Sequence, residues 1–229
     1  MKTACYGLLL GLLIACQQGS IDTVQPEYAD WYTLRSPDNR TIEAVWGDID
    51  KTVVISTMFT LYRTVDRGKT WQEALEQNSG MMGIISLRDT LFVSSGLTHG
   101  GGTLIMGNAG LYSVDDGVTW LPYKRFNPII YRGIPLNPIK APNGTTYSIR
   151  RQYLDDSTKS ARRFITPGVV TQTGRRIDLP NLHQFSMLAL DQKGRLYVAG
   201  SDEICEQSPN FRFCNGGRGV VYVSKQPLP

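Results

Sequence analysis

The chain has few of the residues that build metal centres or long helices. Its 229 residues include only 2 His and 4 Cys, which lie too far apart for a cysteine/histidine zinc centre. The net charge of +4 is too small to indicate a nucleic-acid partner. Runs of Ala, Glu, Lys and Leu are scarce, whereas 23 Gly, 12 Pro and 11 Tyr are typical of short strands joined by tight turns. The composition therefore predicts an all-β protein with no metal or cofactor and no nucleic-acid partner.

Long hydrophobic runs are also lacking. The apolar stretch from Gly7 to Ile14 is too short to span a bilayer, and it follows a positively charged start at Lys2. The stretch ends in Leu13-Ile14-Ala15-Cys16, so this region resembles a bacterial lipoprotein signal peptide. An ordinary cleaved signal followed by a coincidental Cys is the alternative.

The resemblance implies a processed and anchored chain. Residues 1–15 would be removed, Cys16 would carry acyl chains that hold the protein on a membrane, and residues 16–28 would form a tether. Gln17 after the Cys fits export to the outer membrane. The expected location is the bacterial cell envelope, in the outer membrane, on either its periplasmic or its surface-exposed side.

The cysteines fit this location. Cys5 would be lost with the signal and Cys16 would be acylated, which leaves Cys205 and Cys214 as a pair on an exported chain. Disulfides persist in such compartments, so we predict a bond between these two residues. Two reduced, buried thiols are the alternative.

One eight-residue pattern occurs twice, at residues 64–71 and 113–120, and both copies read Ser/Thr-x-Asp-x-Gly-x-Thr-Trp. This pattern resembles the Asp-box (BNR) repeat of sialidases and related β-propellers. The Asp would accept hydrogen bonds from turn amides, the Gly would take a positive φ, the Thr would begin the next strand, and the Trp would pack between sheets. We therefore expect structural roles for Asp66, Gly68, Thr70, Trp71, Asp115, Gly117, Thr119 and Trp120.

The spacing of the repeat predicts the architecture. The two Asp residues are 49 positions apart, which suits a propeller blade of four antiparallel strands. Residues 29–229 then hold a small β-propeller, with four blades favoured over five. The third blade should open with a strand over Leu136–Ala141. The strand at Asp30–Leu34 should complete the last blade, because it resembles the strands that open at Trp71 and Trp120. Val220–Ser224 resembles a strand that precedes a box, but no Trp-led strand follows it.

The expected binding site lies on the face opposite the boxes, where three long loops span residues 95–108, 150–162 and 201–218. Between residues 121 and 180 the chain has eleven Lys or Arg and three Asp, a local balance of +8. An anionic partner such as an acidic glycan is the hypothesis that follows. The candidate ligand-binding residues are His99, Arg151, Tyr153, Arg162, Phe211, Arg212 and Arg218.

The predicted function is that of a binding or assembly module, with an acidic glycan or a cell-surface protein as partner. Two alternatives are a glycoside hydrolase of the sialidase type and a structural subunit of a surface complex. The sialidase alternative departs from its family, because Tyr131-Arg132-Gly133-Ile134-Pro135 has an inserted Gly and lies in mid-chain. No Glu matches the role of assisting the nucleophile, so no catalytic residue is assigned.

Overall fold

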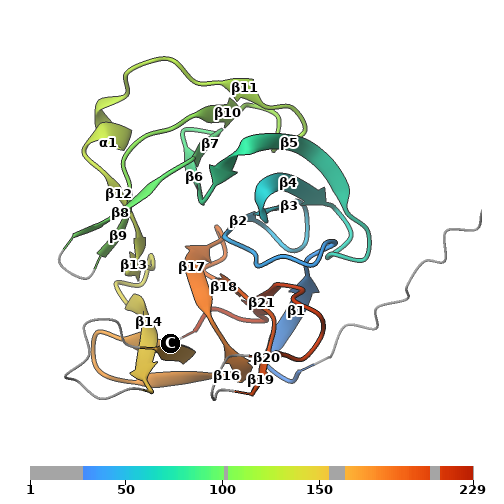
Figure 1. Cartoon of the computed structure of the whole chain (residues 1–229). Helices are drawn as coiled ribbons and strands as arrows, with labels where there is room; N and C mark the ends of the chain where they lie inside the picture. The colour runs from blue at the N-terminus through green and yellow to red at the C-terminus, as the bar shows by residue number, and fades with distance from the viewer. Residues whose placement is uncertain (1–27, 101–102, 155–162, 207–211, 229) are drawn as a thin grey trace, which may run out of the picture.

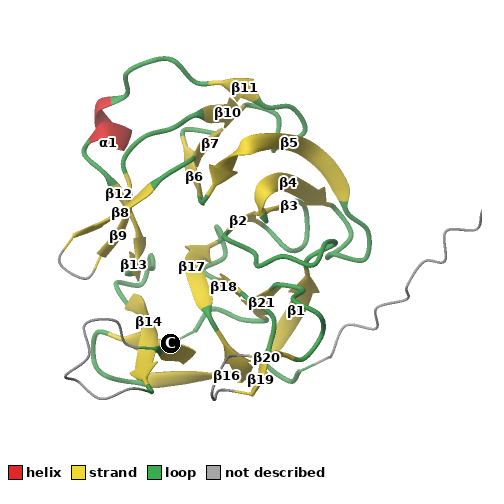
Figure 2. Cartoon of the chain, in the orientation of Figure 1, coloured by secondary structure: helices red, strands yellow, loops and turns green. Residues whose placement is uncertain are grey.

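The computed structural model describes residues 28–100, 103–154, 163–206 and 212–228. These residues form 21 strands and one four-residue helix, α1 (Pro128–Tyr131). Figure 2 shows that strands and loops make up almost all of the described chain. The all-β prediction is confirmed, and the strands are arranged as a β-propeller.

Two four-stranded sheets come from the first half of the chain, and each contains one of the two repeats. The first sheet has the order β2-β3-β4-β5, with strands β2 (Ala44–Gly47), β3 (Val53–Ser56), β4 (Met58–Thr64) and β5 (Gln72–Met81). The second has the order β6-β7-β10-β11, with β6 (Gly83–Leu87), β7 (Thr90–Ser94), β10 (Leu111–Ser113) and β11 (Leu121–Pro122). All of these pairings are antiparallel, as predicted.

Two further four-stranded sheets come mainly from the second half, and one of them also includes the first described strand of the chain. One has the order β13-β14-β15-β16, with β13 (Ile139–Lys140), β14 (Thr146–Tyr153), β15 (Phe164–Thr171) and β16 (Arg176–His183). The closing sheet has the order β17-β18-β21-β1, with β17 (Phe185–Leu190), β18 (Leu196–Gly200), β21 (Val220–Ser224) and β1 (Trp31–Arg35). Strand β1 is outermost and pairs antiparallel with β21, so the predicted closure by the N-terminal strand is confirmed.

The prediction of four blades is wrong, because a fifth, three-stranded sheet lies between the second sheet and the β13–β16 sheet (Figure 1). It consists of β8 (Leu97–Gly100), β9 (Thr103–Met106) and β12 (Ile134–Asn137). The strand expected over Leu136–Ala141 is divided at Pro138, which has no N–H to donate to a ladder. The part before Pro138 pairs with β9 and the part after it pairs with β14.

The buried side chains explain why the hairpin of β8 and β9 joins the propeller. Met106 is fully buried, Leu136 is nearly so, and Leu97 and Leu104 pack against the same core. Gly83, the first residue of β6, also packs closely against this sheet. A Cβ added to it would lie 3.1 Å from Leu97 and 3.0 Å from Leu136. Apolar burial therefore stabilises the added sheet.

The sheets surround a common centre, where their inner strands meet (Figure 1). Strand β2 contacts β17 on one side and β6 on the other, and β17 also contacts β12 and β14. Strands β3, β18 and β21 have the sequences VVIS, LYVAG and VVYVS and are buried throughout. Side chains that are β-branched or aromatic favour extended backbone, and burial on both faces selects these apolar runs.

The two repeats form the same turn. Asp66 Oδ1 accepts a hydrogen bond from Thr70 N at 2.9 Å, and Asp66 Oδ2 accepts one from Thr70 Oγ1 at 2.6 Å. Asp115 and Thr119 have the same two bonds at 2.9 and 2.6 Å. The hydrogen bonds from Thr119 and Ser113 lower the pKa of the Asp115 carboxyl to about 2. Both oxygens of each Asp carboxylate therefore accept hydrogen bonds within their own turn.

Gly and Trp complete these turns. Gly68 and Gly117 have φ of 76° and 78°, and a Cβ would lie 2.5 Å from Leu34 at the first and 2.7 Å from Val54 at the second. Trp120 is buried in the core, whereas Trp71 is only partly buried. One detail of the prediction is wrong, because the strands that follow begin after the Trp, at residues 72 and 121, and not at the Thr.

The predicted disulfide between Cys205 and Cys214 is present, with Cα atoms 5.2 Å apart. It links β19 (Ile204–Glu206), one strand of a two-stranded hairpin, to the residue that follows β20 (Arg212–Phe213). Strand β19 contacts β16, which places this hairpin beside the β13–β16 sheet. Within the described residues no helix is long and apolar enough to cross a membrane.

Candidate binding surfaces

The structure places the predicted ligand-binding residues that it describes on several elements, and only Arg151 and Tyr153 among them share a strand. His99 belongs to β8, Arg151 and Tyr153 to β14, and Arg212 to β20. Arg218 is half-buried just before β21. Arg162 and Phe211 lie outside the described residues, as does the predicted lipidation residue Cys16.

The clearest surface among them is an Arg–aromatic stack on the hairpin of β14 and β15, in the blade that was predicted to be basic. The Arg151 guanidinium carbon lies 5.0 Å from the centroid of the Phe164 ring. The Tyr153 ring meets Phe164 edge-on, with centroids 6.0 Å apart. Arg151 and Tyr153 are two residues apart in one strand, so both point to the same face. We call these three side chains the hairpin stack.

The chemistry of the hairpin stack suits an anionic or sugar ligand. Arg151 is exposed, and 46% of Tyr153 is exposed. The guanidinium is planar, and its contact with the ring helps to fix the orientation of that plane, from which N–H groups can donate two parallel bonds to a carboxylate or phosphate. The aromatic rings beside it offer apolar surface to the ligand.

Neighbouring basic residues behave differently. Arg150 points to the opposite face of β14, where its Nη2 forms an ion pair with Asp178 Oδ1 at 2.7 Å. Arg212 on the disulfide hairpin pairs with Glu206 at 3.0 Å. Arg150 and Arg212 therefore each have a carboxylate partner within the protein.

Sequence reasoning missed a second feature, a cavity of about 370 Å³ on the face that carries the Asp-box turns. Its wall includes Trp46, Lys51 and four carboxylates, which are Asp48, Asp89, Asp116 and Asp191. In a blade of antiparallel strands, the turn between the first and second strands lies at the same end as the box turn. The turns at residues 48–52 and 191–195 therefore meet here. The turn sequence Gly47-Asp48-Ile49-Asp50 was the feature of the sequence that could have indicated this cavity.

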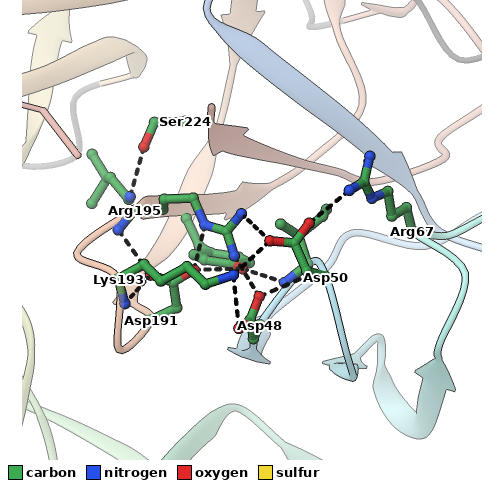
Figure 3. A network of polar contacts seen from close by, with 10 residues as sticks. Asp48, Asp50, Arg67, Asp191, Lys193, Arg195 and Ser224 are labelled. Carbon is green, nitrogen blue, oxygen red and sulfur yellow. Dashed lines mark hydrogen bonds and ion pairs between the residues drawn. The ribbon is translucent and has the colours of Figure 1, made fainter. Parts of the chain in front are cut away.

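Two of these four carboxylates, Asp48 and Asp191, form ion pairs with Arg195. They belong to a network that also includes Asp50 and connects the closing sheet to the first sheet (Figure 3). Arg195 donates from Nε to Asp191 at 2.6 Å, from Nη1 to Asp50 at 2.8 Å, and from Nη2 to Asp48. Lys193 and Arg67 each reach Asp50 at 2.7 Å. Hydrogen bonds from Lys193 and Arg195 hold the pKa of Asp50 far below its ordinary value. This network joins two blades.

The remaining carboxylates do not form a metal site. Among the described residues, no group of three or more His, Cys, Asp or Glu side chains is arranged to hold a metal ion.

His183 is fully buried, with Nδ1 3.0 Å from the Ser201 carbonyl and Nε2 3.0 Å from the Tyr222 hydroxyl. Burial lowers the pKa of His183 to about 4, which favours the neutral ring at physiological pH.

Comparison with known proteins gives a likeness only at the level of structure. No family model and no curated protein sequence matches the chain. One of the solved structures that it is similar to is described as "YCF48 bound to D1 peptide". That match has a TM-score of 0.33 and 12% sequence identity, and it covers 89% of this chain and 98% of the other.

Proposed function

We propose that the protein is a lipid-anchored binding module of the bacterial cell envelope that recognises an anionic ligand, with acidic glycans as the first class to examine. The observation that carries this proposal is the hairpin stack, in which Arg151 and Tyr153 are exposed and both contact the half-buried ring of Phe164. The basic balance of the surrounding segment adds a long-range attraction for anions.

The hairpin stack can be tested by removing its charge. Arg151→Ala should weaken binding of an acidic glycan by about tenfold or more, because a hydrogen bond to a charged group contributes roughly 1.5–3 kcal/mol. Binding would be measured on an array of sialylated, uronic-acid and sulfated glycans, followed by titration of the best ligand. Arg151→Lys should recover only part of the affinity, since Lys keeps the charge but lacks the planar fork.

Lys69→Ala is the matched control, because it removes an exposed positive charge from a box turn. Its affinity should equal that of the unaltered protein. Equal affinity for Arg151→Ala would place the anionic site elsewhere, and a preference for neutral glycans would refute the anionic ligand itself.

The anchor is tested separately. Cys16→Ser should release the protein from the membrane fraction, because the anchoring energy is expected to come from acyl chains at about 0.8 kcal/mol per buried CH₂. Cell fractionation and immunoblotting would measure this. Cys5→Ser is the control, since Cys5 lies in the part of the signal that is expected to be removed. Membrane retention of Cys16→Ser would contradict lipid anchoring.

A further inference from the structure

A second exposed surface lies on the segment that follows the second box, residues 121–132. Phe126 is 74% exposed and Tyr131 is 68% exposed, and their ring centroids are 5.3 Å apart. Leu121 and Ile129 on the same segment are also exposed. Single exposed apolar residues are ordinary, but a group of four on twelve residues indicates an interaction surface.

The segment is held in shape by its other residues. Tyr123 N donates to Gly110 O at 2.8 Å, and the Tyr123 ring packs edge-on against Phe92 with centroids 5.0 Å apart. Asn127 Oδ1 accepts from Ile129 N at 3.0 Å and so caps α1, whose Ile130 is buried in the core. Because the backbone is fixed in this way, Phe126 and Tyr131 are presented without a large ordering cost on binding.

Phe126 forms a wall shared by two hollows. One has a volume of about 370 Å³ and is lined by Leu87, Phe92, Phe126 and Ile129, with Arg88 also on its wall. The other has a volume of about 70 Å³ and is lined by Tyr123, Phe126, Ile130 and Tyr131, together with Arg125. Two adjoining hollows that each have apolar side chains in the wall can receive separate side chains of a single ligand.

The charged side chains that line the hollows, Arg88 and Arg125, are both positive. Arg88, Lys124, Arg125 and Arg132 are all exposed. No Asp or Glu occurs in the sequence from Gly117 to Leu154. Asp89 follows Arg88 in the chain, but it lines the cavity on the box face and neither of these two hollows. A partner that complements this surface must carry negative charge beside its apolar groups.

We propose that residues 121–132 and the two hollows beside Phe126 form a docking site for an acidic segment of another polypeptide. Aromatic or aliphatic side chains of that segment fill the hollows, and its carboxylates face the four cations. The hollows favour a peptide over a lipid surface, because each is bounded by side chains and has room for individual groups. This site is separate from the hairpin stack and does not depend on the proposed glycan binding.

The test uses the purified full-length chain to select peptides from a library of random 12-residue sequences. The selected peptides should be rich in Asp and Glu next to Phe, Trp, Leu or Ile. Phe126→Ser should weaken their binding by about tenfold or more, in line with the loss of a central aromatic anchor. Arg125→Glu together with Arg132→Glu should weaken binding by a similar factor and reduce its dependence on salt.

Two controls make the result specific. Val114→Ser removes another exposed apolar side chain, on a box turn, and should leave peptide binding unchanged. Arg151→Ala should also leave it unchanged, which separates failure of this site from failure of the hairpin stack. Thermal unfolding of each variant would show that the fold is intact.

Three outcomes would overturn the proposal. The first is that no peptides are selected, or that those selected lack acidic residues. The second is binding that does not depend on Phe126. The third is Phe126-dependent binding to vesicles of phosphatidylglycerol and phosphatidylcholine without any peptide binding, which would assign the surface to a membrane.

Discussion

Deletion of β1 (Trp31–Arg35) should abolish folding of the propeller. This strand pairs with β21 over five residues, from Trp31 opposite Ser224 to Arg35 opposite Val220. Leu34 is fully buried and Trp31 is nearly so, and the two side chains belong to different core clusters. Leu34 also supports the first box turn, since its Cδ2 would lie 2.5 Å from a Cβ on Gly68. One strand therefore serves the closing sheet and the neighbouring blade together.

The size of the effect follows from what is lost. Burial of each large apolar side chain contributes about 1.5–3 kcal/mol, and each ladder hydrogen bond adds about 1 kcal/mol. The sum is comparable with the whole stability of a domain, about 5–15 kcal/mol. Deletion would also expose the edge of β21, a run of apolar residues that could pair with other chains.

Far-ultraviolet circular dichroism and urea denaturation would measure the loss. Removal of residues 17–26, which belong to the expected tether, is the control and should leave the unfolding transition in place. A synthetic peptide that spans residues 28–36, added to the truncated chain, should restore part of the structure. A cooperative transition in the truncated chain without the peptide would show that closure by β1 is not required.

The closure could be predicted from the sequence because it depends on local patterns. Val220–Ser224 resembles the strands that precede the boxes, and Trp31 matches the Trp that ends each box. The fifth sheet could not be predicted in this way. Strand β9 is a short apolar run next to Gly residues, and its partner β12 lies about 30 positions further along the chain. Pairing at that distance is decided by burial in the completed fold and not by local propensity.

The candidate sites show the same limit. Composition indicated a basic segment around Arg151. It did not indicate that Phe164 contacts Arg151, because that contact depends on the strand register that pairs Phe164 with Tyr153. The charged network on the box face joins residues 48–50 to residues 191–195, which are far apart in the sequence. Each turn alone resembles an ordinary polar turn, because Asp and Gly are common in turns.

That network yields the second prediction, that Arg195→Met should destabilise the protein by about 3–5 kcal/mol, the cost of removing one partner from a buried ion pair. The Arg195 side chain is 6% exposed and its partner Asp191 is 1% exposed. Asp191 also accepts hydrogen bonds from Lys193 N and Arg195 N at 2.9 Å, so its carboxylate is fixed and cannot turn to water. Met fills similar space but leaves that charge unpaired.

The free energy of unfolding in urea would measure this effect. Lys193→Met is the matched control, because Lys193 joins the same network but is 53% exposed, and exposed pairs contribute at most about 1 kcal/mol. If Arg195→Met costs no more than Lys193→Met, the network does not hold the two blades together.

The double variant Asp191→Asn with Arg195→Met separates pairing from packing. Once Asp191 is neutral, loss of the guanidinium no longer leaves a buried charge, so the double variant should be more stable than the sum of the single effects predicts. Additive effects would instead mean that Arg195 acts through Asp48 and Asp50 on the first sheet. Because these two carboxylates lie on a different blade, the cycle shows whether Arg195 stabilises its own turn or the contact between blades.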